Sequence, residues 1–375
     1  MDASLYEGLD GLRRLKADWL ALHGSASVFA RYEWTLAAVT HLVPSGSVFF
    51  CRISDASDRV AAIVPAFLGN VSVRPFRKLR AISLGLSHEL ALFDFPMRPG
   101  VDAAAVGEAM LRAFREVRST WDLVHWSRVM ADGNAARVAK SMRDSRVVLT
   151  SSSVCNTFET IGSPEALFDS LPKNMRSNLK KCSKRLAQTG VARACLARDD
   201  ERTITRFFDE FLRIEASGWK GREGQNSAVA LRPAIRGFYQ ALLAQNSDEF
   251  ESDIAVLFVD DRAVAAEFLI RSARWQHVYK IGYDEEFARC SPGQLLLGSV
   301  LERACASESI DRVSLVTGMP WHHNWGPNPE PTLEVLIFRD HWHPLVLRNA
   351  RAIAAKVRGV RRRLDESVKP LRDHR

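Results

Sequence analysis

The hydrophobic positions of the first 152 residues recur at spacings that predict alternating helices and strands. Apolar residues three and four apart predict helices over 9–22, 32–42, 103–117 and 134–142. Short runs rich in β-branched and aromatic residues predict strands over 48–54, 60–68, 121–127 and around 147. Elements that alternate in this way predict an α/β domain with a mixed central sheet.

The same order of elements returns in the second part of the chain. Predicted helices cover 172–188, 201–217, 233–245 and 292–307. Predicted strands cover 253–259, 263–271, 275–283, 313–316 and 333–338. The serine run at 151–153 marks a change of composition between the two parts. We therefore expect one domain over 1–152 and a second over 153–343.

The end of the chain, 344–375, combines amphipathic and basic character. Apolar residues from 344 to 364 are alternately four and three apart, which predicts an amphipathic helix. Between Arg348 and Arg375, ten Lys or Arg residues stand against three Asp or Glu residues, so this segment carries most of the net charge of +8. The pattern leaves three options open for such a helix. It packs on the second domain, it binds an anionic partner such as a membrane surface, an acidic carrier protein or nucleic acid, or it remains solvated.

Composition narrows the class of protein. A hydrophobic content of 46% in 375 residues excludes a disordered chain and is sufficient for two cores. No run approaches the ~18 apolar residues of a spanning helix, and the first residues lack a secretory signal. Six cysteines without CxxC spacing predict reduced thiols. We expect a cytoplasmic protein, with the inner face of the membrane as one docking place open to the basic helix.

Signatures of several enzyme classes are missing from the chain. It has no Walker A loop, no strand-linked GxGxxG, no HExxH and no GxSxG. Nucleotide hydrolysis, dinucleotide redox chemistry, zinc proteolysis and α/β-hydrolase chemistry therefore lack support. His322 and His323 are adjacent, but no third ligand with suitable spacing accompanies them, so we expect no metal.

The predicted helix over 172–188 concentrates positive charge. Met175, Leu179, Cys182 and Leu186 share one face of it. Six cations and no acidic residue occupy the remaining surface, namely Lys173, Arg176, Lys180, Lys181, Lys184 and Arg185. This pattern suits a phosphate of CoA, of a nucleotide or of a phosphorylated acceptor, and it equally suits a solvated face without a partner.

Three segments of the second part carry a resemblance to a known family: KNMRSNLKKCSKRL, then EASGWKGREG, then DDRAVAAEFLI with YKIGYDEEFARCSPGQLLL. Their order resembles the CelD/BcsL-like acyltransferases of the GNAT superfamily, also described as the BioF2-like acetyltransferase domain. The segments DWLAL, FARYEW and VPAFL of the first part are similar to elements of the same family. The resemblance therefore covers most of the chain.

This resemblance implies two tandem GNAT-like domains, each a mixed central sheet flanked by helices, with the second domain catalytic. The fold class is then α/β (α+β), followed by the basic C-terminal helix. Acetyl-CoA or a longer acyl-CoA is the implied co-substrate. The implied acceptor is a small molecule or sugar nucleotide of envelope or exopolysaccharide synthesis.

GNAT enzymes bind the donor pyrophosphate on backbone N–H groups at a helix start that follows a central strand. The matching segment here runs from Arg289 to Gln294. Pro292 suits the first helical turn, Ser291 suits the cap, and Gly293 permits close approach to the backbone. The resemblance therefore predicts that Arg289, Ser291, Gly293 and Gln294 bind the cofactor.

Acylation of an amine needs a group that accepts a proton and a group that protonates the leaving thiolate. The resemblance makes Glu267, in the apolar run AVAAEFLI, a general base; the alternative is an edge-strand residue that points to solvent or pairs with Arg271. Tyr283 is the candidate proton donor, or a packed tyrosine. Alternation along the strand predicts Tyr279 and Tyr283 on one face and Lys280 on the other.

The segment TGMPWHHNW from Thr317 to Trp325 departs from the family pattern. Relatives carry a Tyr-Lys pair followed by Trp, and here Trp321 and His322 replace the pair while Trp325 remains. Because a histidine titrates near neutrality, His322 is a second candidate base. Loss of the lysine puts the usual contact with acceptor or phosphate in doubt.

The predicted substrate contacts include a loop and three residues near the catalytic candidates. Trp219 and Lys220 lie between glycines in a loop that can fold over a ligand, or that is a turn with one anchoring tryptophan. The other predicted substrate contacts are Tyr279, Asp284 and Trp325.

Three functions remain open at this point. The leading hypothesis is an acyl-CoA-dependent N- or O-acyltransferase, with no nucleic acid partner. The second is a Fem-type transferase, which has a similar tandem architecture and takes its acyl group from aminoacyl-tRNA; the basic segments suit tRNA. The third is a non-catalytic GNAT-like interaction module, which the altered Trp-His motif favours.

Overall fold

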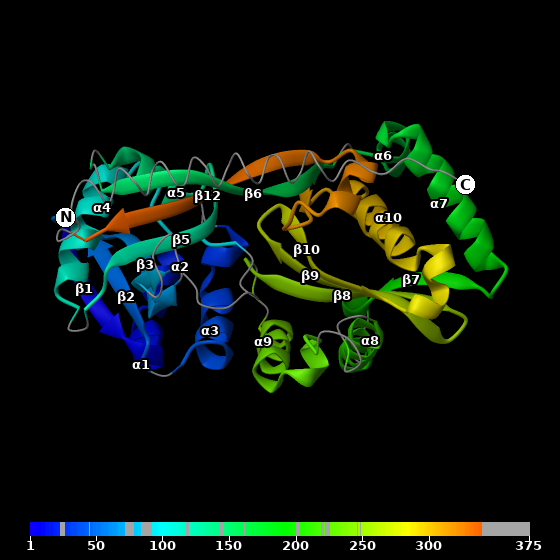
Figure 1. The fold of residues 1–375 in the computed structure, drawn as a ribbon, viewed down its shortest axis with the longest axis horizontal. Helices are drawn as coiled ribbons and strands as arrows, with labels where there is room; N and C mark the ends of the chain where they lie inside the picture. Colours follow the sequence, from blue (N-terminus) through cyan, green and yellow to red (C-terminus); the bar gives the residue numbers. More distant parts are fainter. Residues whose placement is uncertain are drawn as a thin grey trace. The chain divides into compact units, whose positions relative to one another are not determined.

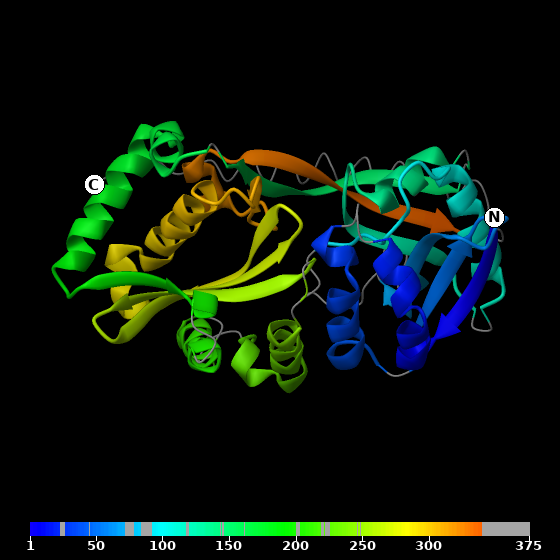
Figure 2. The same ribbon diagram turned by 180° about the vertical axis from the view of Figure 1, so that it is seen from behind.

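The computed structural model describes residues 1–339 apart from 23–26, 45, 72–78, 84–91, 118–119, 143, 145, 161, 200–202, 219–220, 222–225, 246 and 248. The described residues form two compact units, one within 1–26, 43–153 and 331–339, the other within 27–42 and 154–330. Figures 1 and 2 show the elements of each unit from two sides. The predicted basic helix and tail over 344–375 lie outside the described residues, as do Trp219 and Lys220.

The first unit contains a mixed sheet with helices on both faces (Figure 1). Its strands are β1 (Asp2–Glu7), β2 (Val48–Ser54), β3 (Val60–Val71), β4 (Leu79–Ser83) and β5 (Leu123–Met130), with parts of β6 (Val147–Glu159) and β12 (Asn328–Phe338). Its helices are α1 (Gly8–Arg14), α2 (Lys16–Ala21), α4 (Ala103–Arg115) and α5 (Asn134–Ser141). Strands β1 to β5 pair in chain order, antiparallel except for β4 with β5, and β12 pairs antiparallel with β5.

Neighbouring aromatic residues of β2 show how the helices cover this sheet. The ring of Phe49 lies 5.6 Å from that of Phe114 on α4. The ring of Phe50 lies 5.9 Å from that of Trp19 on α2. Because successive side chains of a strand point to opposite faces, α2 and α4 cover opposite faces of the sheet.

The second unit contains the remaining strands and the helices that surround them. Its strands are β7 (Ala192–Leu196), β8 (Glu251–Val259), β9 (Arg262–Ser272), β10 (Trp275–Tyr283) and β11 (Arg312–Ser314), with the remainder of β6 and β12. Its helices are α3 (Tyr32–His41), α6 (Pro164–Ser170), α7 (Lys173–Ala187), α8 (Ile204–Ser217), α9 (Pro233–Ala244) and α10 (Pro292–Cys305). Short 3₁₀ helices include η6 (Glu285–Cys290) and η7 (Pro320–Trp325).

The sheet of the second unit has the order β7-β8-β9-β10-β11-β6. Strands β7 to β10 are antiparallel, and β10 pairs in parallel with β11. Phe268 of β9 contacts Tyr239 of α9 and Phe211 of α8, with ring centroids 4.8 and 5.9 Å away. Its neighbour Glu267 therefore points to the opposite face, where α10 and α7 pack (Figures 1 and 2).

Helix α3 belongs to the second unit although it precedes most of the first in the chain. Trp34 of α3 lies 5.2 Å from the ring of Phe238 on α9. Just before the helix, buried Arg31 forms an ion pair with Glu249 at 3.1 Å and donates to Ser272 Oγ at 2.7 Å. Compared with the predicted domains, α3 lies in the second unit instead of the first, and the end of β12 lies in the first unit instead of the second. The predicted boundary near residue 152 stays a prediction.

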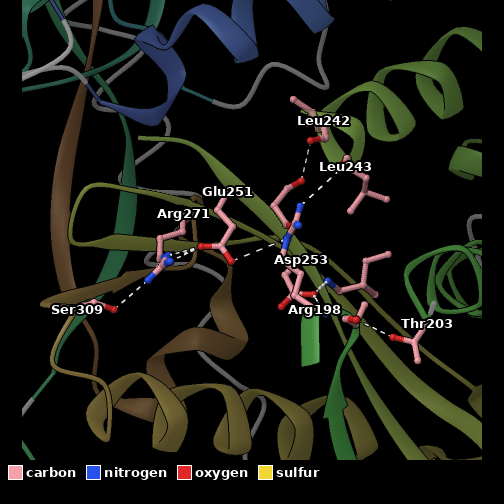
Figure 3. Close-up of polar contacts among 11 residues, drawn as sticks. Arg198, Thr203, Leu242, Leu243, Glu251, Asp253, Arg271 and Ser309 are labelled. Carbon is pink, nitrogen blue, oxygen red and sulfur yellow. Dashed lines mark hydrogen bonds and ion pairs between the residues drawn. The ribbon is translucent and has the colours of Figure 1, made fainter. Parts of the chain in front are cut away.

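A polar network joins β8, β9 and the short 3₁₀ helix η3 (Ala197–Asp199) that follows β7 (Figure 3). Arg271 donates through Nε to Glu251 Oε2 at 2.9 Å and through Nη1 to Ser309 Oγ at 2.9 Å. The Nε of Arg198 lies 3.9 Å from Glu251 Oε1, and its backbone N–H donates to Asp253 Oδ1 at 3.1 Å. A cavity of about 250 Å³ lies beside this network, between the sheet and the C-terminal half of α10. Since these charges neutralise one another, the network stabilises the fold.

The mixed α/β class with helices flanking each sheet is confirmed. The strands predicted over 48–54 and 275–283 coincide with β2 and β10. The short strands β1, β4 and β7 escape the pattern, and the helix predicted over 9–22 is divided at Leu15. Within the described part of the chain, no helix is long and apolar enough to cross a bilayer.

Candidate functional site

A cavity of about 610 Å³ opens in the second unit beside the C-terminal part of β10. Strand β10 pairs with β11 only at Trp275–His277, opposite Arg312–Ser314. Beyond these residues the cavity lies between β10, the start of α10 and the segment that contains η7. Six of the predicted site residues line it, namely Tyr279, Tyr283, Ser291, Gly293, Gln294 and His322.

A β-bulge changes the faces predicted for β10. The register of β10 against β9 shifts between Val278 and Lys280, so Tyr279 lies at the bulge. The Tyr279 ring lies 5.9 Å from that of Tyr239, and Lys280 Nζ lies 5.9 Å from the same ring. Tyr283 lies against α10 instead, next to Gly293. The predicted face shared by Tyr279 and Tyr283, with Lys280 opposite, is therefore wrong.

The start of α10 supplies one wall of the cavity. Ser291 is the residue before the helix, as predicted, but its side chain makes no capping hydrogen bond. Its carbonyl accepts from the N–H groups of Gln294 and Leu295 at 3.0 and 3.2 Å. An α-helix leaves the earliest N–H groups without an internal acceptor, and Pro292 has none to offer. The N–H of Gly293 is thus the donor that the helix itself leaves unused.

Two residues beside the cavity adopt left-handed backbone conformations. Ser291 has φ of 46° and Val316 has φ of 60°. Left-handed backbone is costly for a residue with a Cβ, and more so for a β-branched residue such as Val316. Strain of this kind gathers at functional sites, where the surrounding structure holds it in place.

Gln294 and Trp325 act as a pair. The indole N–H of Trp325 donates to Gln294 Oε1, and Trp325 itself is buried in the core that α7 and α10 share. Trp325 does not line the cavity, so it positions Gln294, which does. Gln294 presents its remaining amide group from the first turn of α10.

His322 of η7 lines the cavity and is almost fully buried. Its Nδ1 lies 3.1 Å from Nδ2 of Asn156 on β6. An amide nitrogen only donates, so Nδ1 accepts and the ring proton is assigned to Nε2. Burial lowers the pKa of His322 to about 4, so the ring is neutral at physiological pH.

Glu267 of β9 is close to the cavity but does not line it. The side chain has no exposed surface, and neither carboxylate oxygen has a hydrogen-bond partner among the described residues. Burial raises the pKa of Glu267 well above its usual value. The alternative of a residue that points to solvent or pairs with Arg271 is wrong, because Glu267 is fully buried and Arg271 binds Glu251. The role of Glu267 as a base stays a prediction.

Two further predicted residues lie outside the cavity lining. Asp284 accepts from the backbone N–H of Glu286 at 3.1 Å and pairs with Arg262 at 2.6 Å, so it fixes the start of η6. The exposed Arg289 accepts a hydrogen bond at its carbonyl from Arg185 Nη1, 3.2 Å away. Their predicted ligand contacts stay predictions.

The cavity also contains residues that the sequence pattern does not single out. Leu315, Thr317 and Met319 line it, and Asn156 supports His322 from a strand 166 positions earlier. No local spacing points to Asn156, because its contact arises only when β6 pairs with β11. Among the described residues, no group of three or more His, Cys, Asp or Glu could hold a metal ion.

A family profile described as an acetyltransferase (GNAT) domain matches residues 173–323. The matched range contains every residue that lines the cavity. Residues 173–323 thus carry a GNAT acetyltransferase domain, and the chain is an acyltransferase. No curated protein matches the chain. The narrower likeness to CelD/BcsL-like enzymes stays a prediction.

Solved structures resemble the chain in fold. FemX has a TM-score of 0.57 at 10% identity and covers 91% of this chain and 98% of its own. A conserved protein of unknown function from Bacteroides thetaiotaomicron VPI-5482 has a TM-score of 0.56 at 12% identity, with 87% and 97% covered. The C-terminal domain of a putative lysylphosphatidylglycerol synthetase from Agrobacterium fabrum has a TM-score of 0.51 at 10% identity, with 92% and 96% covered. At such identities the likeness shows the fold alone.

Proposed function

We propose that the second unit transfers an acyl group from acyl-CoA directly to an amine or hydroxyl acceptor. The observation that carries this proposal is the cavity between the C-terminal part of β10 and the start of α10. Its volume of about 610 Å³ falls within the usual range of ligand sites. It combines an apolar lining with a few polar groups, which is the pattern of a site that binds and orients a ligand.

The donor site follows from the start of α10. The N–H of Gly293 and the positive end of the helix dipole suit the pyrophosphate of CoA. A Cβ added at Gly293 would meet Tyr283 and Ile281 at 3.7 to 3.9 Å, which is ordinary van der Waals contact, so the protein leaves room for a methyl group but not for a large side chain there. Val278, Ile281 and Leu315 offer apolar contact to the thioester arm.

The chemistry needs one displacement at the thioester carbonyl. The acceptor lone pair attacks the carbonyl carbon, the C–S bond breaks, and the sulfur leaves with the bonding electrons. We assign Tyr283 as the hydroxyl that protonates that sulfur, and the proton lost by the acceptor restores the hydroxyl. We assign neutral His322, with its proton on Nε2, as the hydrogen-bond donor to the oxygen that gains negative charge. The ring of His322 also has a hydrogen bond with the backbone of Thr317, which the substrate oxygen would replace.

This assignment gives His322 a different role from the predicted general base. A ring whose pKa is near 4 is a weak proton acceptor at neutral pH, whereas its N–H remains a good donor. The resemblance to CelD/BcsL-like enzymes supports an acceptor from envelope or exopolysaccharide synthesis, such as an amino sugar or a sugar nucleotide.

The test is calorimetric titration with acetyl-CoA and with a longer acyl-CoA. Gly293→Trp fills the space in front of the first turn of α10, whereas Gly293→Ala adds only a methyl group at van der Waals distance. We expect saturable binding to wild type and to Gly293→Ala, with loss of at least tenfold in affinity in Gly293→Trp.

Turnover with a panel of amines and amino sugars then tests the reaction. We expect His322→Ala to lower kcat by about two orders of magnitude while the Kd for acyl-CoA stays unchanged. Absence of any acyl-CoA binding by folded wild type would overturn the proposal and favour the aminoacyl-tRNA alternative, for which the basic surface of α7 is the supporting observation.

A further inference from the structure

Helix α7 presents a strongly basic surface that the acyl-transfer site leaves unexplained. Its four buried residues are Met175, Leu179, Cys182 and Leu186, which pack into the core with α10. Lys173, Lys180, Lys181, Lys184 and Arg185 are exposed on the other side, and Arg176 is half-buried. We call this set of six cations the α7 basic surface.

Among the residues that the structure describes, most cations of the α7 basic surface have no carboxylate within ion-pair distance. Arg176 lies 3.5 Å from Asp169, and this is the only carboxylate within ion-pair distance of the six cations among the described residues. Arg185 donates to a backbone carbonyl rather than to a carboxylate. Like charges held this close repel one another, so binding of an anionic partner lowers the electrostatic free energy of this surface.

The α7 basic surface borders the acyl-transfer cavity through both ends of the helix. At the C-terminal end, Arg185 bonds to the carbonyl of Arg289 in η6, between the cavity residues Ala288 and Ser291. At the N-terminal end, Pro172 packs within 3.4 Å of the Cβ position of Gly326, directly after η7. Helix η7 contains Trp321 and His322, which line the cavity. A partner on α7 therefore sits beside the cavity.

The shape and composition of this surface narrow the class of partner. No large apolar side chain lies on the exposed face of α7, so the helix lacks the apolar face that membrane binding requires. A straight helix without exposed aromatic residues offers neither base stacking nor entry into the deep, narrow major groove of A-form RNA. Lys173 and Lys184 are eleven positions apart, about 16 Å along the helix, which matches a row of carboxylates on a partner helix.

Apolar exposure at the same place favours a protein partner. Val191, Tyr283 and Met319 are large hydrophobic residues of this unit with 75, 44 and 49% of their surface exposed. Val191 follows α7, and the other two line the cavity. Protein interfaces combine apolar anchors with charge pairs that guide association, and the α7 basic surface together with these three residues offers both.

We propose that the α7 basic surface docks an acidic carrier protein that presents the acyl group as a thioester on a flexible arm. This inference rests on the proposed acyl transfer, because the docked carrier would deliver its thioester into the same cavity. Free acyl-CoA would then be a minimal donor, since it carries the thioester but not the acidic protein surface.

The experiment compares donors with the full chain. Donors are acetylated acyl carrier protein, acetyl-CoA and acetyl-pantetheine, and deacylated tRNA serves as a competing polyanion. Lys181→Glu/Lys184→Glu reverses two exposed charges of α7, and Arg14→Glu/Lys16→Glu makes the same charge change in the first unit. Binding is measured at low and at high salt, and kcat/KM is measured for each donor.

We expect Lys181→Glu/Lys184→Glu to lower kcat/KM with the carrier protein by at least tenfold and to leave kcat/KM with acetyl-pantetheine unchanged. High salt should weaken carrier binding by wild type, and the control variant should behave as wild type. Equal carrier binding by wild type and Lys181→Glu/Lys184→Glu would overturn the docking proposal. The proposal would also fail if the two substitutions weakened the binding of tRNA but not that of the carrier protein. If the protein used acetyl-CoA but did not bind the carrier protein, the docking proposal would be wrong and the acyl-transfer proposal would stand. If the carrier protein bound through α7 but no donor was turned over, the docking proposal would stand and the acyl-transfer proposal would be wrong.

Discussion

Two fully buried carboxyl groups, one in each unit, have opposite environments. Asp94 in the first unit accepts from the backbone N–H groups of Phe95, Asn134 and Ala135 at 2.9 to 3.1 Å. Glu267 in the second unit has no hydrogen-bond partner among the described residues. Burial raises the pKa of both groups, to about 6 for Asp94 and well above the usual value for Glu267. A satisfied buried acid serves the fold, whereas an unsatisfied one is a cost that packing or function must offset.

The first prediction removes the satisfied acid. Asp94→Ala leaves the first-turn N–H groups of α5 buried without an acceptor, so we expect a loss of about 3 kcal/mol in the free energy of unfolding. Urea denaturation with wild type as reference measures it. A loss below about 1 kcal/mol would mean that water replaces the carboxylate, and the comparison with Glu267 would fail.

The second prediction concerns the unsatisfied acid. A carboxyl whose folded pKa is raised contributes stability that is full below its unfolded pKa and is lost as pH rises through the folded pKa. Glu267→Gln cannot ionise, so wild type should lose stability relative to this variant as pH rises above about 4.5. Urea denaturation between pH 4 and 8 measures the difference, which we expect to be smaller than the Asp94→Ala loss at neutral pH.

Glu267→Met serves as the matched apolar replacement. A methionine of similar size leaves no buried polar atom, so this variant should be as stable as wild type or more stable at pH 7. Marked destabilisation by both Glu267→Gln and Glu267→Met would show that the carboxyl has a partner, and Glu267 would then resemble Asp94.

The third prediction uses a buried base of the second unit. His277 lies on β10 with its ring 5.1 Å from that of Phe29, and burial lowers its pKa to about 3. A histidine with a lowered pKa contributes stability that is full above its unfolded pKa of about 6.5 and is lost as pH falls toward the folded pKa. His277→Phe should therefore flatten the fall of stability between pH 6.5 and 4, opposite in sign to the effect of Glu267. If wild type and His277→Phe lost stability equally between pH 6.5 and 4, the imidazole of His277 would not be buried as a neutral ring.

The sequence predicts the elements of the second unit better than it predicts the cavity. Strand β10 matches its predicted range because turns bound it on both sides, and α7 matches closely because its apolar stripe is regular. Tyr283, Ser291, Gly293 and Gln294 lie together at the cavity because they are close in the chain and follow one strand into one helix. Contacts of this local kind follow from periodicity and cap chemistry.

Three features of the cavity depend on tertiary contacts and cannot be predicted from local sequence patterns. The bulge at Tyr279 appears only against β9, because simple alternation contains no extra residue. Asn156 meets His322 only once β6 pairs with β11. The cavity exists because β10 continues past its last pair with β11, and the end of a strand pair is set by the neighbouring segments rather than by residue type.

The smallest expected effect tests whether the cavity is strained. Ser291 has a left-handed backbone with φ of 46°, which glycine adopts without steric cost. Ser291→Gly should therefore stabilise the chain by up to about 1 kcal/mol, whereas Ser291→Ala keeps the Cβ and should change stability little. Asp58 in the first unit has φ of 55° but its side chain pairs with Arg52 at 2.7 Å, so Asp58→Gly should not stabilise the chain. If Ser291→Gly is more stable and binds acyl-CoA more weakly while Asp58→Gly shows neither change, the backbone strain at Ser291 contributes to the donor site. If the two variants behave alike, the strain is a property of the turn and has no role in binding.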